Sequence, residues 1–333
     1  MTQTTFITRR QAIKATAATT AIAASLAQSA AWAQQAFPNK PIRIVVGFPP
    51  GGVADVFGRS IQASLQESLG QPVLIENRAG ANGNLSADLV AKSAGDGYTL
   101  CLSSTGIESV NPLMLPKSFD IARDLQPVAM LGTIQLFLVT KQALPPNNFK
   151  EFLAYAKTNV GKLSYGSAGS GSTPHLAGEL FKLNANVFAT HIPYRGAAPA
   201  MQDLLGGQID FYFDPGIGIP HVRAGRLKMH AVASATRSSL FPEIPTLSEV
   251  GVKGVETDTI FGIWAPSSTP ADVVARLNRE INKALGLATV KQRFKDLGGE
   301  ATPSSVAEFK AKITAETSTF GNVIRSRNIK ADA

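Results

Sequence analysis

One kind of segment constrains this chain more than any other: an apolar strand that passes through a glycine-rich turn directly into a helix. The first junction is residues 44–55 (IVVGFPPGGVAD), and the second junction is residues 163–172 (LSYGSAGSGS). The start of a helix leaves backbone N–H groups without partners and carries a partial positive charge, so such a junction favours a bound anion. Two junctions of this kind, one in each half of the chain, predict a carboxylate held between two lobes.

The first 33 residues have the organisation of an export signal. Arg9, Arg10 and Lys14 precede a weakly apolar, Ala-rich run at 15–30, and residues 31–33 (AWA) offer a small-residue cleavage site. The apolar run is too short and too rich in Ser and Thr for a stable membrane span. Paired arginines indicate the twin-arginine route. We therefore expect a signal peptide at 1–33, cleaved after Ala33, and a mature protein in the periplasm; the alternative is a disordered basic tail on a cytosolic protein.

Composition limits the classes of partner and chemistry. Removal of residues 1–33 would take three positive charges from the formal net charge of +8, and the remaining Lys and Arg are dispersed rather than clustered beside aromatic residues. Such a pattern argues against nucleic-acid binding. Cys101 is the single cysteine, so no intrachain disulfide can form, and we expect it to be a buried small apolar residue. The four histidines lack metal-ligand spacing, so we expect no metal and no cofactor.

Short apolar runs alternate with amphipathic helical patterns along most of the chain, which is typical of α/β folds with parallel-type sheets. The predicted strands are 42–46, 73–76, 98–102, 136–140, 163–165, 187–193, 209–213 and 229–233, with a returning strand within 258–266. We infer that the chain leaves a first lobe near Leu136, builds a second lobe, and returns near Ile260. The first lobe is then residues 36–136 plus 260–333, and the second lobe is residues 137–259. Helices after Pro270 are expected to pack on the first lobe.

Short motifs extend this pattern through nearly all of the chain after the signal. They include KPIRIVV (40–46), FPPGG (48–52), GQPV (70–73), ENR (76–78), DGYTL (96–100), NP (111–112), GKLSYGSAGSGS (161–172), HLAGELF (175–181), PYRG (193–196) and DLLGGQ (203–208). In these motifs the chain resembles the Bug receptors, the extracytoplasmic solute-binding proteins of tripartite tricarboxylate transport systems. It departs from the usual pattern at Gly58, where alanine is common, and at Arg195, where lysine is frequent.

The resemblance implies an α/β fold of the periplasmic binding protein type II-like class, with two lobes joined by a hinge of two crossings. It also implies a receptor that closes on a small organic acid without chemical change. The ligand class stays open among dicarboxylates, tricarboxylates and aromatic acids, captured for uptake or for sensing. The expected partners are this ligand and a membrane permease or a sensor protein, and we expect a monomer.

Candidate ligand-binding residues gather where predicted strands end, which is where open α/β sheets bind ligands. In the first junction, Gly51 and Gly52 let a ligand approach the backbone, and Phe48 is a possible wall. Asp55 is expected to bind loop amides or water and to shape the turn, or to be a plain acid in the first turn of a helix. The complete set of candidates is Phe48, Gly51, Gly52, Asp55, Ser104, Thr105, Ser167, Ala168, Gly169, Ser172, His175, Tyr194, Arg195 and Asp214.

Each candidate outside the first junction also has a purely structural interpretation. The second junction offers amides and hydroxyls for an anion, but a tight turn into a helix has the same sequence pattern. Ser104 and Thr105 are equally explained as turn residues, and Tyr194 and Arg195 as a surface pair. Asp214 is either an acceptor for a ligand group or a helix cap before Pro215.

Two other functions compete with a receptor. A secreted Ser/His hydrolase would use one of His175, His191, His221 and His230, but the chain has no Gly-x-Ser-x-Gly elbow. Turnover of an ester or amide that is abolished by Ser172→Ala would favour it. The other competitor is an interaction protein with a vestigial cleft, which a panel of carboxylate ligands would distinguish from a receptor.

Overall fold

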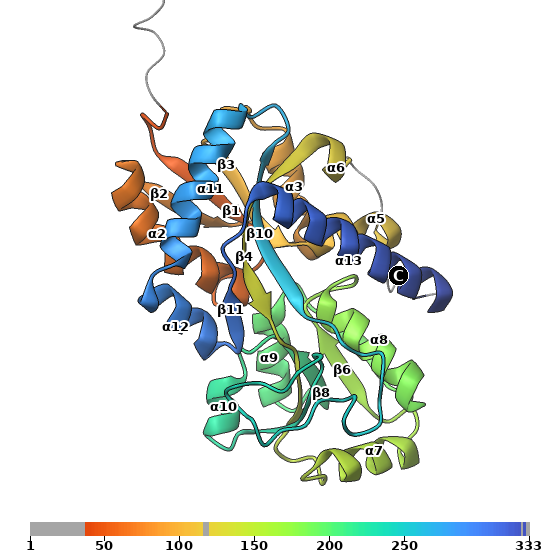
Figure 1. Ribbon diagram of the computed structural model, residues 1–333. Helices are drawn as coiled ribbons and strands as arrows, with labels where there is room; N and C mark the ends of the chain where they lie inside the picture. The colour runs from red at the N-terminus through yellow and green to blue at the C-terminus, as the bar shows by residue number, and fades with distance from the viewer. Residues whose placement is uncertain (1–36, 116–119, 328, 331–333) are drawn as a thin grey trace, which may run out of the picture. The chain divides into compact units, whose positions relative to one another are not determined.

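The computed structural model describes residues 37–115, 120–327 and 329–330. The chain divides into two compact units, Met1–Asn39 and Lys40–Ala333, and the following description concerns the second unit. This unit contains two β-sheets with helices packed on them (Figure 1). The predicted signal peptide at 1–33 lies outside the described residues.

The first sheet has six strands in the order β11-β4-β10-β3-β1-β2. Its strands are β1 (Ile42–Val46), β2 (Val73–Asn77), β3 (Thr99–Ser104), β4 (Leu125–Ile134), β10 (Thr259–Pro266) and β11 (Gly299–Ala301). β1 is parallel to β2 and β3, whereas β10 is antiparallel to both β3 and β4. The helices of this part are α2 (Val53–Leu69), η1 (Ala81–Gly83), α3 (Asn84–Ala91), α4 (Gly106–Ser109), α5 (Asn111–Met114), α6 (Ile121–Asp124), α11 (Ala271–Leu285), α12 (Ala288–Asp296) and α13 (Val306–Arg327).

The second sheet has five strands in the order β7-β6-β8-β5-β9. They are β5 (Phe137–Lys141), β6 (Ser164–Ser167), β7 (Thr190–Pro193), β8 (Phe211–Asp214) and β9 (Leu227–Val232), and the helices are α7 (Phe149–Thr158), α8 (Thr173–Ala185), α9 (Ala197–Leu205) and α10 (Ile219–Arg223). β6 is parallel to β7 and β8, whereas β5 is antiparallel to β8 and β9. Both sheets are therefore mixed, and not wholly parallel as the alternation suggested, because the strands next to the crossings run against their neighbours.

The helices that start at the two junctions follow local sequence rules. In α2, Phe57, Ile61 and Leu65 lie on one buried face, and Gly70 ends the helix in the left-handed conformation with φ of 64°. In α8, the side chain of Ser172 accepts the N–H of His175, and Pro174 lies in the first turn. Local sequence thus places a helix N-terminus directly after β1 and directly after β6.

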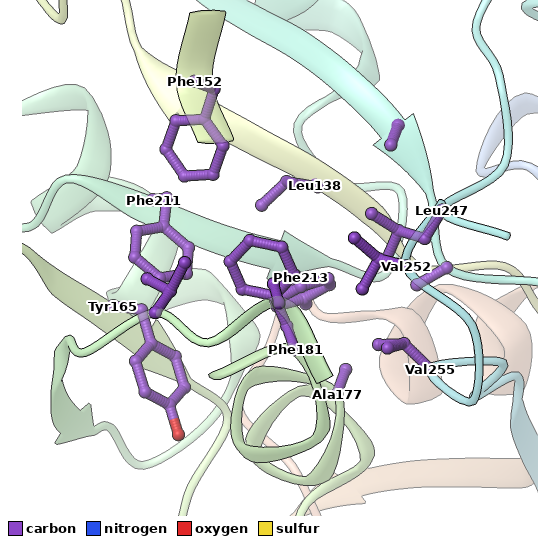
Figure 2. Close-up of a cluster of buried hydrophobic side chains, with 14 of the residues drawn as sticks. Leu138, Phe152, Tyr165, Ala177, Phe181, Phe211, Phe213, Leu247, Val252 and Val255 are labelled. Atoms are coloured by element: carbon purple, nitrogen blue, oxygen red, sulfur yellow. The ribbon is translucent and has the colours of Figure 1, made fainter. Parts of the chain in front are cut away.

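An aromatic cluster forms the core on one face of the second sheet (Figure 2). The ring of Phe152 on α7 packs against Phe181 on α8 and Phe211 on β8, with centroid distances of 6.1 and 5.5 Å. Pairs of this kind each add about 0.5–1.5 kcal/mol beyond the apolar area they bury. In the first sheet Cys101 is fully buried as predicted, and burial raises the pKa of its thiol to about 12.

The chain passes between the sheets twice, and the two crossings lie side by side. β4 leads into β5 through residues 135–136, and the chain returns from β9 to β10 through residues 233–258. The N–H of Ala233 donates to the carbonyl of Leu136 at 2.8 Å, and the N–H of Thr257 donates to the carbonyl of Ala233 at 2.9 Å. β1–β4, β10 and β11 fall in the residues expected for the first lobe, except that β10 already begins at Thr259.

The last helix, α13, contacts both lobes and not, as was expected, only the first lobe. It packs on the first lobe through Phe309 and Ile313, which are buried with Trp264. Its far end also contributes to a buried cluster that includes a residue of α8 in the second lobe. That cluster is Val110, Leu176, Phe320, Ile324 and Ile329.

Candidate functional site

The two junctions meet at one small cavity, which we call the inner cavity. Its volume is about 30 Å³, enough for roughly two water molecules. Both junctions and both lobes contribute to its wall. The lining residues are Phe48, Gly52, Val53, Ala54, Asn82, Ser104, Ala168, Ser172, Thr173, Pro174, Ala197, Pro215, Thr259 and Phe261.

Three backbone N–H groups without an acceptor in the described part of the chain belong to residues that line the inner cavity. Within the described residues, no acceptor takes the N–H of Val53 or Ala54 at the start of α2, or that of Thr173 at the start of α8. All three residues line the cavity, and none of the lining residues carries a formal charge. Two helix N-termini from opposite lobes therefore direct their partial positive charge at the same space.

In the first junction, Asp55 shapes the turn. Its carboxylate accepts the N–H of Gly51 at 3.0 Å, the amide of Asn77 at 3.0 Å and the guanidinium of Arg59 at 2.9 Å. Burial raises the pKa of Asp55, but the hydrogen bonds from Arg59, Gly51 and Asn77 together outweigh it and hold the pKa below its usual value. The N–H of Gly51 is thus already occupied, and this exposed residue lines neither the inner cavity nor the outer cavity described below.

In the second junction, two stacked imidazoles support the turn from behind. Nδ1 of His175 accepts the N–H of Gly171 at 3.1 Å, so this nitrogen carries no proton. The side chain of Ser167 accepts the N–H of Gly169 at 3.1 Å and bonds Nε2 of His191 at 2.7 Å. The two rings are stacked with centroids 4.1 Å apart. Ser167 and His175 are fully buried and line neither cavity, so they hold the turn instead of facing a ligand.

Two further candidates, Thr105 and Asp214, form hydrogen bonds with other groups of the protein. Thr105 directs its hydroxyl toward the carbonyl of Ile260, while its neighbour Ser104 lines the inner cavity. Asp214 accepts the N–H groups of Gly216 at 3.0 Å and Gly218 at 2.8 Å. Burial raises the pKa of Asp214 to about 7, although these backbone hydrogen bonds act in the opposite direction. Asp214 is therefore the cap of the turn before α10, as in its structural interpretation.

A second cavity of about 200 Å³, which we call the outer cavity, adjoins the inner one. The two share Phe48, Asn82 and Ala168. The other lining residues of the outer cavity are Gly47, Gly80, Ala81, Gly83, Leu115, Gly169, Ser170, Pro193, Tyr194 and Arg195. Several of them follow β2 and β7, the edge strands on the side of each sheet away from the crossing strands, so this cavity lies farther from the hinge.

Several lining residues were not among the candidates, and Asn82, Thr259 and Phe261 of the inner cavity are three of them. Asn82 lies in a loop of unusual backbone, with φ of 49°, and donates to the side chain of Asn111 at 2.8 Å. The run AGANG at 79–83 contains the residues that tolerate positive φ, and this signal could have found the loop. Thr259 and Phe261 begin the returning strand, and nothing in the local sequence marks them as facing a cavity.

A larger cavity, of about 800 Å³, lies elsewhere among the described residues. It is lined by first-lobe residues of α5, α6 and α13 and the start of β4, and neither junction contributes to it. Size alone would favour it, but the convergence of free N–H groups from both lobes favours the inner and outer cavities as the ligand site. Within the described residues there is no group of three or more His, Cys, Asp or Glu side chains placed to hold a metal ion.

Comparison with known proteins agrees with this geometry. The family model described as "Tripartite tricarboxylate transporter family receptor" matches residues 57–329. The chain belongs to this family. The resemblance to Bug receptors is thereby confirmed, and so is the two-lobed α/β fold of the periplasmic binding protein type II-like class.

Individual relatives of this receptor family cover most of the chain. Protein BugT of Bordetella pertussis is 37% identical over 298 residues, which are 88% of this chain and 91% of BugT. The periplasmic binding protein BugD has a TM-score of 0.84 and 31% identity, covering 89% of this chain and all of that one. Rpa4515 of R. palustris, solved with adipate, has a TM-score of 0.86 and 33% identity, covering 89% of this chain and 99% of that one.

The receptor family is extracytoplasmic. Across the described part of this family member, none of the helices combines the length and the apolar character that a membrane span requires.

Proposed function

We propose that this protein is a periplasmic receptor that captures a small organic acid between its two lobes for uptake or sensing and releases it unchanged. The supporting observation is that free N–H groups at the starts of α2 and α8 line one cavity whose wall contains no charged side chain. A carboxylate suits such a site, because it can accept several N–H hydrogen bonds and its negative charge complements the partial positive charge of two helix N-termini.

The strength of these contacts is sufficient for a transport receptor. A hydrogen bond to a charged acceptor contributes about 1.5–3 kcal/mol, and a helix N-terminus adds about 0.3–2 kcal/mol. Association itself costs about 4–15 kcal/mol. Donors from Val53, Ala54 and Thr173, with apolar contacts from Phe48 and Phe261, are thus compatible with micromolar affinity, which is about −8 kcal/mol.

Entry of a ligand requires the cavities to widen. The inner cavity holds only about 30 Å³, less than a small organic acid occupies, so the lobes must separate before binding. We propose that residues 135–136 and 233–258 act as a hinge for this motion. The observation that Rpa4515 was solved with adipate supports a carboxylate ligand for the present receptor. We further propose export by the signal peptide at 1–33, a monomeric state, and delivery of the ligand to a membrane permease or a sensor protein.

A hydrolase is a weaker proposal on this geometry. The Ser167 hydroxyl and the His191 imidazole lie 2.7 Å apart, as a nucleophile and base would, but the serine is fully buried and supports the turn. The Ser172 hydroxyl lines the inner cavity, but it accepts the N–H of His175 as a helix cap. Neither serine combines an accessible hydroxyl with a histidine that could act as its base.

A ligand panel tests the receptor proposal. Purified mature protein, unfolded and refolded to remove any retained ligand, would be melted with monocarboxylates, dicarboxylates, tricarboxylates, aromatic acids and acidic amino acids. A compound that binds only the folded state stabilises it by mass action and so raises the Tm. At a concentration about one hundred times the Kd, the free energy of unfolding increases by about 2.7 kcal/mol. We expect a saturable rise for at least one acid and no consumption of that acid. Tm values unchanged across the whole panel would contradict the proposal.

A further inference from the structure

Charge is distributed unevenly along the two joined cavities. The inner cavity is lined by uncharged residues alone, whereas the lining of the outer cavity contains one cation, Arg195, and no acid. Because the cavities share part of their wall, an elongated molecule can extend from one into the other. Such a molecule would meet two helix N-termini at one end and a guanidinium group at the other.

The Arg195 side chain is available for a ligand. Its guanidinium is exposed and, in the part of the chain that the structure describes, forms no hydrogen bond or ion pair. The backbone beneath it is held firmly, since Tyr194 donates its N–H to the carbonyl of Ser167 at 3.1 Å and its hydroxyl to Asp203 at 2.7 Å.

The next residue anchors Arg195 against the opposite lobe. Gly196 has a φ of 129°, and a Cβ at this position would lie 2.3 Å from Cδ of Pro49 in the first junction. Only glycine permits this approach. The backbone that carries Arg195 is therefore placed beside the first junction, while its guanidinium group stays available for a ligand.

We propose that Arg195 is a specificity-determining residue that binds the second acid group of a diacid. This inference rests on the proposed receptor function and adds to it that the ligand has two anionic ends. The first carboxylate accepts the free N–H groups of the inner cavity, and the second lies beside Arg195 in the outer cavity. A planar guanidinium suits a carboxylate because it can donate two parallel hydrogen bonds.

The same geometry disfavours a monoacid with an apolar tail. Its tail would lie beside the guanidinium, displacing water from the cation and offering no acceptor in return. Selectivity is the difference between the binding free energies of the diacid and the monoacid. It therefore increases both when Arg195 attracts the second carboxylate of the diacid and when Arg195 disfavours the apolar tail of the monoacid. Because Arg195 is exposed, water weakens the pair, and we expect a preference on the order of tenfold.

Matched pairs of acids with equal carbon number test the inference. Succinate, glutarate and adipate would be compared with butanoate, pentanoate and hexanoate by calorimetric titration of the refolded mature protein. We expect at least one diacid to bind about tenfold more tightly than its monoacid, and added salt to reduce this ratio. Arg195→Gln should abolish the ratio by weakening the diacid while leaving the monoacid unchanged, and Arg195→Lys should retain part of it.

A second arginine provides the control. Arg293 on α12 is also exposed and lines neither cavity, so Arg293→Gln removes the same charge and should preserve the ratio. If monoacids and diacids bind equally and Arg195→Gln changes neither, the inference is overturned and the carboxylate receptor stands. If no acid in the series binds the wild-type protein, both proposals fail for aliphatic acids.

Discussion

The two junctions present the same free N–H groups but are stabilised by different chemistry. In the first junction, a carboxylate organises the turn: Asp55 holds the N–H of Gly51 and pairs with Arg59. In the second junction, neutral groups do this, as His175 and Ser167 hold the N–H groups of Gly171 and Gly169. A helix N-terminus can therefore be prepared for an anion with or without a formal charge nearby, and the two solutions should respond differently to mutation and pH.

The largest effect is expected when the second junction itself is changed. Gly169 has a φ of 122°, and a Cβ there would lie 3.2 Å from the carbonyl of Tyr194. Gly169→Val should cost about 1–3 kcal/mol of folding stability through backbone strain, and it should weaken ligand binding at least about tenfold. Denaturant unfolding and calorimetric titration measure the two effects.

Gly207 offers a matched control for this variant. It also has a positive φ, of 75°, but open space surrounds its Cβ position and it lines neither cavity. Gly207→Val should lose comparable stability and keep its affinity. Equal affinities in the two variants would remove Gly169 from the site.

A smaller effect is expected from the imidazole behind the second junction. His175→Ala removes the acceptor of the buried Gly171 N–H, and an unsatisfied donor costs about 1–3 kcal/mol, so Kd should rise about tenfold. His175→Asn should retain most of the affinity, because its Oδ1 can replace Nδ1 as acceptor.

The smallest effect is expected in the first junction. Asp55→Asn loses the charge-assisted bonds to Arg59 and Gly51 and should destabilise the fold by about 1–2 kcal/mol, with a few-fold rise in Kd. The pKa of Asp55 is lower in the folded than in the unfolded protein, so its stabilisation is complete above about pH 4 and is lost as the pH falls through the folded value. The first junction should thus keep its shape down to about pH 4.

Asp88 on α3 provides the comparison, since it pairs with Lys92 at the same spacing but lines neither cavity. Asp88→Asn should cost no more than about 0.5 kcal/mol and leave Kd unchanged. If the two variants lose equal stability and affinity, Asp55 has no special role in the turn.

The parts of the site that could be predicted from the sequence are those that local rules determine. Prolines and glycines between an apolar strand and an amphipathic helix specify a free helix N-terminus, so both junctions, including Gly52 and Ser172, were found without a structure. Local rules do not say which way a polar side chain turns. Ser167, His175 and Asp214 accept N–H groups of their own loops, and Thr105 faces the carbonyl of Ile260 on the returning strand, although the same residue types would suit a ligand.

Other contributors depend on how distant segments meet. Thr259 and Phe261 line the inner cavity only because the returning strand pairs with β3 and β4. The antiparallel direction of that strand follows from the double crossing, which hydrophobic periodicity does not encode. The positions of the strands and helices could therefore be predicted from the sequence, but their relative directions could not.

The buried cluster at the end of α13 has a mechanical consequence. Phe320 and Ile324, from the last helix of the first lobe, meet Leu176 on α8, whose first turn carries the unused Thr173 donor. If α8 tilts away from the first lobe, these apolar side chains become exposed to water, which costs about 25 cal/mol for each Å² of apolar surface. The contact between α13 and α8 therefore favours the arrangement in which the two lobes lie together, and any separation of the lobes that moves α8 must overcome it.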